Sequence, residues 1–236
     1  MKTRIRPLVI CFAALAGALA AQTSSVRIEQ TVEPQFPAAL AFTSINHGEV
    51  NVIICVDADG HLADLLVSGY TDRAFADEAV DALKHWRYTP AYDHGRPIGV
   101  RMELRFDFSA TGRVVSLLAI DTLKNLYDQT MGGPLMVNRV CPPHELDHPV
   151  VPVAPVSPGN PGKLAGAASG PRSVVVDFYV DENGQPRMPV AVKYPHEALA
   201  VAAVDALSRW RFTTPTRAGK PVAVRVQQEF IFPASS

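Results

Sequence analysis

The chain has 236 residues, of which 47% are hydrophobic and 19% are charged, and its formal net charge is −1. This composition is typical of one or two globular domains and excludes an intrinsically disordered chain. The 22 basic residues are balanced by 23 acidic ones and form no long basic run, so we expect no nucleic-acid partner.

The first 21 residues have the three parts of an export signal: a basic start, an apolar run over residues 8–19, and the small-x-small pattern Ala18-Leu19-Ala20. The apolar run is shorter than the ~20 residues that span a membrane comfortably. The sequence therefore predicts an exported protein with a cleaved signal peptide over residues 1–21. The alternative is a retained membrane anchor through residues 8–21.

The remaining sequence contains one segment twice, at an offset of 124 residues that relates Trp86 to Trp210. The best-matched pairs are Val56–Gly60 with Val180–Gly184, Ala79–Thr89 with Ala203–Thr213, and Gly95–Phe108 with Gly219–Phe232. An ungapped match of this length indicates that one supersecondary unit is used twice.

Each copy begins with two predicted strands. Alternating apolar residues over residues 50–56 and 174–180 indicate strands with one buried face. Asp59-Gly60 and Asn183-Gly184 then predict hairpin turns, in which both glycines have a structural role because such turns need positive φ. The second strands are expected over residues 61–68 and 185–194.

A helix and a final strand complete each copy. Apolar residues at helical spacing lead up to Trp86 and Trp210, which we expect to anchor the two cores. Alternation over residues 98–108 and 222–232 predicts the final strands. The sequence thus predicts an α+β fold with two small antiparallel sheets of three strands, each with a helix on one face.

The two copies are joined by a connector of two parts. Residues 113–131 can form an amphipathic helix, which Gly132-Gly133-Pro134 would end. Residues 149–171 are rich in Pro, Gly, Ala and Ser, which predicts an extended or flexible linker. The expected domains are residues 27–109 and residues 172–233, with the connector over residues 110–171.

Two cysteines, Cys55 and Cys141, follow the export signal. In an exported protein they can pair as a disulfide that ties the connector to the first sheet. The alternative is two free thiols.

Five motifs follow one another in the first copy: Pro34-Gln35-Phe36-Pro37, Gly48-Glu49-Val50, Asp57–Gly60, Trp86-Arg87-Tyr88-Thr89-Pro90 and Gly95-Arg96-Pro97. As a set, they resemble the C-terminal domain of the TonB energy-transducer family. The second copy resembles this family in part. It keeps Trp210-Arg211-Phe212, but we expect its opening Pro-x-aromatic-Pro motif and first helix to be missing.

The resemblance implies an α-β-β-α-β order for the first copy and a β-β-α-β order for the second. It also implies a periplasmic binding module related to TonB-dependent transport. An extended segment of an outer-membrane receptor or another envelope protein would add as a strand beside the last strand of the sheet. The candidate edge consists of Val100, Arg101, Met102, Glu103, Leu104 and Arg105, and the opening motif contributes Glu33, Pro34 and Gln35.

The second copy offers another edge, Val224–Ile231, which we expect to be solvated because the opening motif is missing there. Glu33 stands where the family often has Gln. The alternatives to receptor binding are an envelope scaffold without a transport role and a homodimer paired through the exposed edges.

The connector also contains His144-Glu145-Leu146-Asp147-His148, which has the H-E-x-x-H pattern of zinc peptidases. Pro142, Pro143 and Pro149 enclose this segment, leave room for barely one helical turn, and bias His148 away from helical dihedrals. We therefore expect no enzyme, no catalytic or metal site and no cofactor. A zinc metallopeptidase is the alternative.

Overall fold

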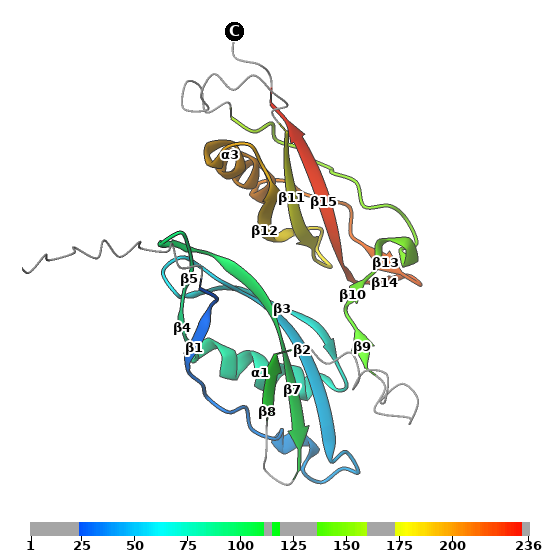
Figure 1. Cartoon of the computed structure of the whole chain (residues 1–236). Coiled ribbons are helices and arrows are strands. Elements are labelled where there is room, and N and C mark those ends of the chain that lie inside the picture. The colour runs from blue at the N-terminus through cyan, green and yellow to red at the C-terminus, as the bar shows by residue number, and fades with distance from the viewer. Residues whose placement is uncertain (1–23, 111–114, 119–135, 160–172, 233–236) are drawn as a thin grey trace, which may run out of the picture.

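A computed structural model describes residues 24–110, 115–118, 136–159 and 173–232 (Figure 1). The first repeat contains β1 (Arg27–Gln30), η1 (Ala38–Leu40), β2 (His47–Val56), β3 (Leu62–Tyr70), α1 (Arg73–Lys84), β4 (Arg87–Thr89), β5 (Ala91–Asp93), β6 (Arg96–Ile98) and β7 (Val100–Ser109). The connector contains β8 (Val115–Leu118), β9 (Val137–Asn138), β10 (Val140–Cys141) and η2 (Pro143–Glu145). The second repeat contains β11 (Ser173–Val180), β12 (Pro186–Lys193), α3 (Glu197–Ser208), β13 (Thr216–Arg217), β14 (Lys220–Pro221) and β15 (Ala223–Ile231).

Each repeat is built on three antiparallel strands, in the order β7-β2-β3 in the first and β15-β11-β12 in the second. One helix, α1 or α3, covers one face of each sheet (Figure 1). The predicted α+β fold is confirmed. The predicted sheets are too small, because connector strands extend them to β8-β7-β2-β3-β9 and β10-β15-β11-β12.

The helix-covered face of each sheet carries the core, and both predicted tryptophan anchors lie in it. Trp86 is 6% exposed, and its ring centroid lies 5.7 Å from that of Phe106. Trp210 is 7% exposed, and its ring centroid lies 5.2 Å from that of Phe230. Apolar residues at helical and strand spacing therefore identify both cores correctly.

The two predicted hairpin glycines have positive φ, +83° at Gly60 and +73° at Gly184. A Cβ built on Gly184 would lie 2.1 Å from the carbonyl oxygen of Phe212. Any side chain there would therefore combine left-handed backbone strain with a clash against backbone that cannot move easily.

Gly184→Ala is expected to lower the free energy of unfolding by roughly 2–4 kcal/mol, from both left-handed strain and the displaced backbone. Gly219 is the matched control, because its φ is +71° and an added Cβ would meet nothing within 4 Å. Gly219→Ala should cost only about 1 kcal/mol, the strain alone. Urea unfolding measures both, and equal losses would show that the close approach to Phe212 does not matter.

The second repeat begins earlier than predicted. Trp86 Nε1 donates a hydrogen bond to the Val32 carbonyl at 2.8 Å, and Trp210 Nε1 donates to the Val156 carbonyl at 2.7 Å. Likewise, Ile28 pairs with Tyr88 in the first repeat, and the antiparallel bridge Pro152–Phe212 is its counterpart at the same offset. Residues 150–158 therefore follow the course of residues 26–34.

The second copy thus has a counterpart of residues 26–34, although its Pro-x-aromatic-Pro motif lacks the aromatic residue, as the sequence predicts. Pro158-Gly159-Asn160-Pro161 aligns with Pro34-Gln35-Phe36-Pro37, so both prolines are kept and only the aromatic residue is replaced. A composition rich in proline is thus compatible with a defined course of residues 150–158 along the second repeat, which includes one β-bridge at Pro152. We infer that the second repeat starts near Val150 rather than at residue 172.

The connector also differs from the prediction. Residues 115–118 form β8, paired antiparallel with β7, where an amphipathic helix is predicted over residues 113–131. An exposed strand edge offers unpaired backbone groups, and a short apolar segment can satisfy them as a strand. The rest of the predicted helix lies outside the described residues.

The predicted export signal also lies outside the described residues. Among the helices that the structure describes, none has the length and apolar character needed to cross a membrane.

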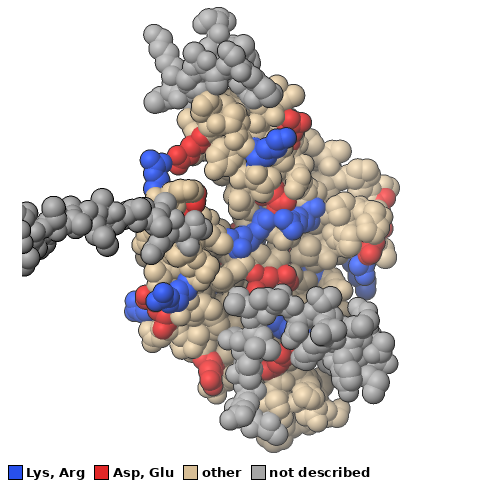
Figure 2. Space-filling model, viewed as in Figure 1, with Lys and Arg blue, Asp and Glu red and all other residues tan. Residues whose placement is uncertain are grey.

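The two repeats pack together through the sheet faces that carry no helix. Ile53 and Leu66 of the first repeat form one apolar cluster with residues of the second repeat, namely Tyr179, Met188 and Ala223. Three ion pairs among the described residues join the two repeats: Arg101 binds Asp177, Arg187 Nε donates to Asp64 at 2.9 Å, and Arg96 lies 3.5 Å from Glu197 at the surface. Figure 2 shows basic and acidic side chains intermixed where the repeats meet.

Both cysteines are free in the structure, so the predicted disulfide is not formed. Cys55 packs against the inter-repeat cluster, as does Val140. Because side chains alternate along a strand, Cys141 points to the opposite face from Val140, where it is buried. The two thiols therefore lie on opposite sides of the sheet layer of the second repeat. Burial raises the pKa of the Cys55 thiol.

Candidate functional site

Of the last strands of the two repeats, β15 has the longer outer side without a paired strand among the described residues. Its inner side pairs with β11 along the whole strand, from Ser173–Ile231 to Val180–Val224. Its outer side pairs only at Ala223 and Val224, with the parallel strand β10. Within the described parts of the chain, no strand pairs with the outer side of Arg225–Ile231, which we call the open edge (Figure 1).

The direction of the backbone groups follows from one hydrogen bond. The Ala223 N–H points outward, because it donates to the Arg139 carbonyl at 2.7 Å. Backbone groups alternate between the two sides of a strand, and β15 pairs with β11 without a register shift. The N–H groups of Gln227, Glu229 and Ile231 therefore point to the open edge.

One outward carbonyl is already occupied by a side chain. Gln228 Nε2 donates to the Glu229 carbonyl at 2.7 Å, and both residues lie at the surface of the strand. A flexible amide that bonds its neighbour's carbonyl can be displaced by a backbone N–H of an added strand at small cost. The open edge is therefore able to accept another strand.

The first repeat shows what occupies the equivalent place. There β8 pairs antiparallel with β7 from Leu104 to Asp107. The residues of β15 at the same offset are Gln228 to Ile231, within the open edge. The protein therefore already contains one strand addition, at the edge that the sequence predicts as the binding site.

The predicted site in the first repeat is largely engaged by the protein itself. Arg101 lies in the inter-repeat interface, where it binds Asp177, donates to the Met188 carbonyl at 3.1 Å and stacks 5.0 Å from the ring centre of Tyr179. Arg105 is 7% exposed and binds Glu49. Leu104 is buried, Val100 and Met102 are half-buried, and Glu103 is exposed.

In the opening motif, Glu33 and Gln35 are exposed and Pro34 is buried. The structure thus keeps only Glu33, Gln35 and Glu103 of the predicted binding residues fully accessible. For the edge Val224–Ile231, the sequence predicts a solvated strand rather than a binding site. The signal that could have corrected this is the retained Pro-x-x-Pro spacing at Pro158 and Pro161.

A buried carboxylate fixes the start of the open edge. Asp177 is 1% exposed, and it accepts hydrogen bonds from Arg225 Nε at 3.0 Å and Gln227 Nε2 at 3.1 Å, besides binding Arg101. Burial raises the pKa of Asp177, but the hydrogen bonds from Arg225, Arg101 and Gln227 outweigh it and leave the pKa below 3.8. Asp177 therefore stays ionised and ties β15 to the inter-repeat interface.

The H-E-x-x-H segment has a structural role in this fold. His144 and Glu145 lie in the three-residue η2, and His148 follows outside it. Glu145 accepts from Arg217 at 2.9 Å, and Asp147 accepts from the N–H groups of Ala218 and Gly219. These contacts hold the connector against the β13–β14 hairpin, and the two histidines do not share the rigid helical turn that a zinc peptidase uses.

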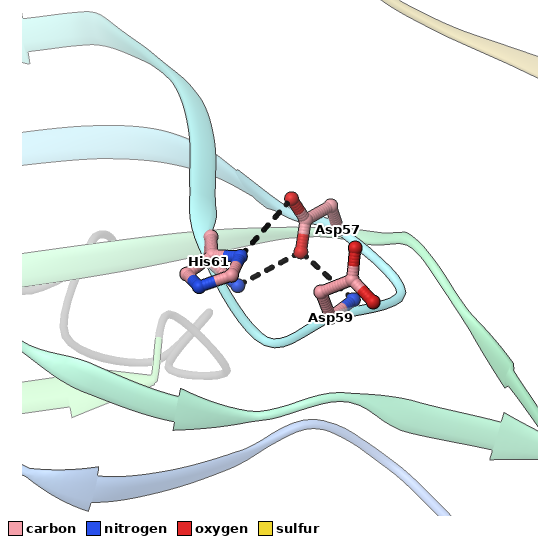
Figure 3. A group of neighbouring side chains, drawn as sticks. All are labelled: Asp57, Asp59 and His61. Atoms are coloured by element: carbon pink, nitrogen blue, oxygen red, sulfur yellow. Dashed lines mark hydrogen bonds and ion pairs between the residues drawn. The ribbon is translucent and has the colours of Figure 1, made fainter.

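Asp57, Asp59 and His61 lie close together in the β2–β3 turn (Figure 3). Asp57 Oδ1 accepts from the backbone N–H groups of Asp59 at 2.9 Å and His61 at 2.8 Å. In the second repeat, Asp181 accepts from Asn183 and Gln185 in the same way, at 2.9 Å each. Because the bonds persist where the other two side chains are amides, the shared function of the aspartate is to shape the turn.

Comparison with known families gives one match. Residues 32–110 and 172–233, together more than half of the chain, match the family model described as the Gram-negative bacterial TonB protein C-terminal. The comparison with curated proteins gives no significant match. The matched segments end shortly after β7 and after β15 and include both strands.

Proposed function

The chain belongs to the family of TonB C-terminal domains, and on this premise we propose that it binds an extended segment of an outer-membrane receptor or another envelope protein. The segment adds as a strand to the open edge of β15. At the family level, such a domain is a protein-interaction module of the bacterial envelope, without enzymatic chemistry. The place of action we propose is the periplasm.

The observation that carries this proposal is the contrast between the two last strands. β7 has an added strand over Leu104–Asp107, whereas the equivalent part of β15 has none among the described residues. An unpaired edge costs little in water but is a ready template for a partner strand. The second repeat is therefore the one that binds.

Self-pairing is less favourable than binding a different segment. An antiparallel pair of two β15 strands in the register centred on Glu229 would place Glu229 opposite Glu229 of a second copy. Like charges directly opposite each other destabilise a strand pair. We therefore propose receptor or envelope-protein binding in place of the edge-paired homodimer.

Site-specific photo-crosslinking in the bacterial envelope tests the proposal. A photoreactive residue in place of Ile231, whose side chain is 78% exposed, should crosslink to an outer-membrane receptor or another envelope protein. The same residue at Asp81, on the exposed face of α1, is the control and should give no such product. The proposal fails if the Ile231 product persists unchanged when Glu229→Pro removes an outward N–H from the open edge.

A further inference from the structure

We propose that the segment bound at the open edge carries a basic residue opposite Glu229, so that Glu229 determines which segments bind. This inference rests on the proposed function and specifies its partner. It follows from the position that Glu229 occupies in the repeat and from the charges around it.

The first repeat has the opposite charge at this position. Arg105 corresponds to Glu229, and it is buried, binds Glu49 and has its Nε 3.4 Å from Asp107 Oδ1. The residue that corresponds to Glu49 is Ser173, which carries no charge. The second repeat has therefore reversed the charge and lost its internal counter-charge.

The surroundings of Glu229 offer no close cation within the described chain. Its cross-strand neighbour on β11 is Val175, and its neighbours two positions away along the same face are Gln227 and Ile231. Lys193 lies beyond Val175 on β12 and makes no ion pair with Glu229 within 4.0 Å. Arg225 is engaged with Asp177.

Glu229 is thus an exposed carboxylate that makes no ion pair among the described residues. The nearest position for a counter-charge is the strand that would add to the open edge. Opposite charges on directly paired residues stabilise a strand pair, and like charges destabilise it.

The register of β8 predicts which residue of the partner lies opposite Glu229. β8 pairs Leu117 with Arg105 and Val115 with Asp107. Transferred to the second repeat, the same antiparallel register places position 117 opposite Glu229 and position 115 opposite Ile231. The partner class is therefore an extended segment with the pattern apolar-x-basic, its apolar residue covering Ile231.

Synthetic peptides with the sequence of residues 113–120 test the inference on the whole protein. The parent peptide is compared with versions that carry Leu117→Lys or Leu117→Glu, at about 0.15 M salt, where surface charges are screened beyond ~8 Å. The Lys peptide should bind about tenfold more tightly than the Glu peptide, because one favourable pair replaces one unfavourable pair. Fluorescence anisotropy of labelled peptides measures both affinities.

Two protein variants make the assignment specific. Glu229→Lys should reverse the order, so that the Glu peptide binds more tightly. Glu29→Lys makes the same change of charge at an exposed glutamate of β1, outside the predicted binding residues, and should leave the preference for the Lys peptide unchanged.

The outcomes separate this inference from the proposed function. Equal binding of the Lys and Glu peptides, or a preference that survives Glu229→Lys, overturns the role of Glu229 and leaves strand addition intact. If none of the three peptides binds the unaltered protein, strand addition itself is contradicted.

Discussion

Asp177→Ala is expected to lower the free energy of unfolding of the second repeat by about 3–5 kcal/mol, the cost of breaking a buried ion pair from one side. Asp177 is 1% exposed and binds Arg101, whose side chain is only 13% exposed. Its removal leaves that guanidinium without a carboxylate inside the inter-repeat interface. Arg225 and Gln227 lose their acceptor at the same time.

Urea unfolding followed by Trp210 fluorescence measures this loss, in a Trp86→Phe background because the chain has two tryptophans. Asp205→Ala is the control. Asp205 forms an exposed pair with Arg209 one helical turn away, and such pairs contribute only about 0.3–0.5 kcal/mol. A loss below about 1 kcal/mol for Asp177→Ala would contradict a buried, energetically important contact.

The same carboxylate predicts a dependence on pH. The pKa of Asp177 is lower in the folded protein than in the unfolded chain, through its hydrogen-bond donors. Its stabilising effect is therefore fully present above the unfolded pKa and is lost as the pH falls through the folded pKa. The decline of stability below about pH 4 should be shallower in Asp177→Asn than in the unaltered protein, since the unfolded pKa of Asp is ~3.9.

Glu229→Pro is expected to weaken binding of the Lys peptide at least about tenfold, since it removes one backbone donor, the carboxylate and the space that an added strand needs. The β11–β15 ladder should survive, because the Glu229 N–H points away from β11. Gln228→Pro is the contrasting variant: its N–H points toward β11, so it should destabilise the second repeat itself.

Peptide titration with a thermal melt distinguishes these two effects. Glu229→Pro should lose binding with little change of melting temperature, whereas Gln228→Pro should lower the melting temperature by several degrees. Full peptide affinity in Glu229→Pro would show that the peptide binds elsewhere.

The repeat, its hairpins and its two cores could be predicted because they depend on local patterns that occur twice. Trp86 and Trp210 mark the same place in both copies, and turn glycines follow both first strands. The course of residues 150–158 is not predicted, because a proline-rich composition indicates a flexible linker. The sequence signal for this course is that Val156 lies at the repeat offset from Val32; the carbonyls of these two residues accept the hydrogen bonds of Trp210 and Trp86.

The packing of the repeats through their helix-free faces and the strand β8 in the connector could not be predicted from local patterns. Apolar residues near β8 fit a helical stripe or a strand equally well, and only the exposed edge of β7 decides between them. The packing of the repeats had one signal: Val175 and Tyr179 lie on the face of β11 opposite to the core residues Val174, Val176, Phe178 and Val180, so both faces carry apolar residues. The binding edge itself depends on where β8 lies, and therefore required the structure.

Residue-resolved hydrogen exchange tests strand addition to β15 most directly. In the free protein, the outward amides of Gln227, Glu229 and Ile231 should exchange rapidly, because no described strand covers them. Saturation with the Lys peptide should slow the exchange of Gln227, Glu229 and Ile231 and leave the inward amides of β15 unchanged. If these three amides exchange as rapidly with the peptide bound, or if protection appears on another strand instead, the open edge of β15 is not the binding site.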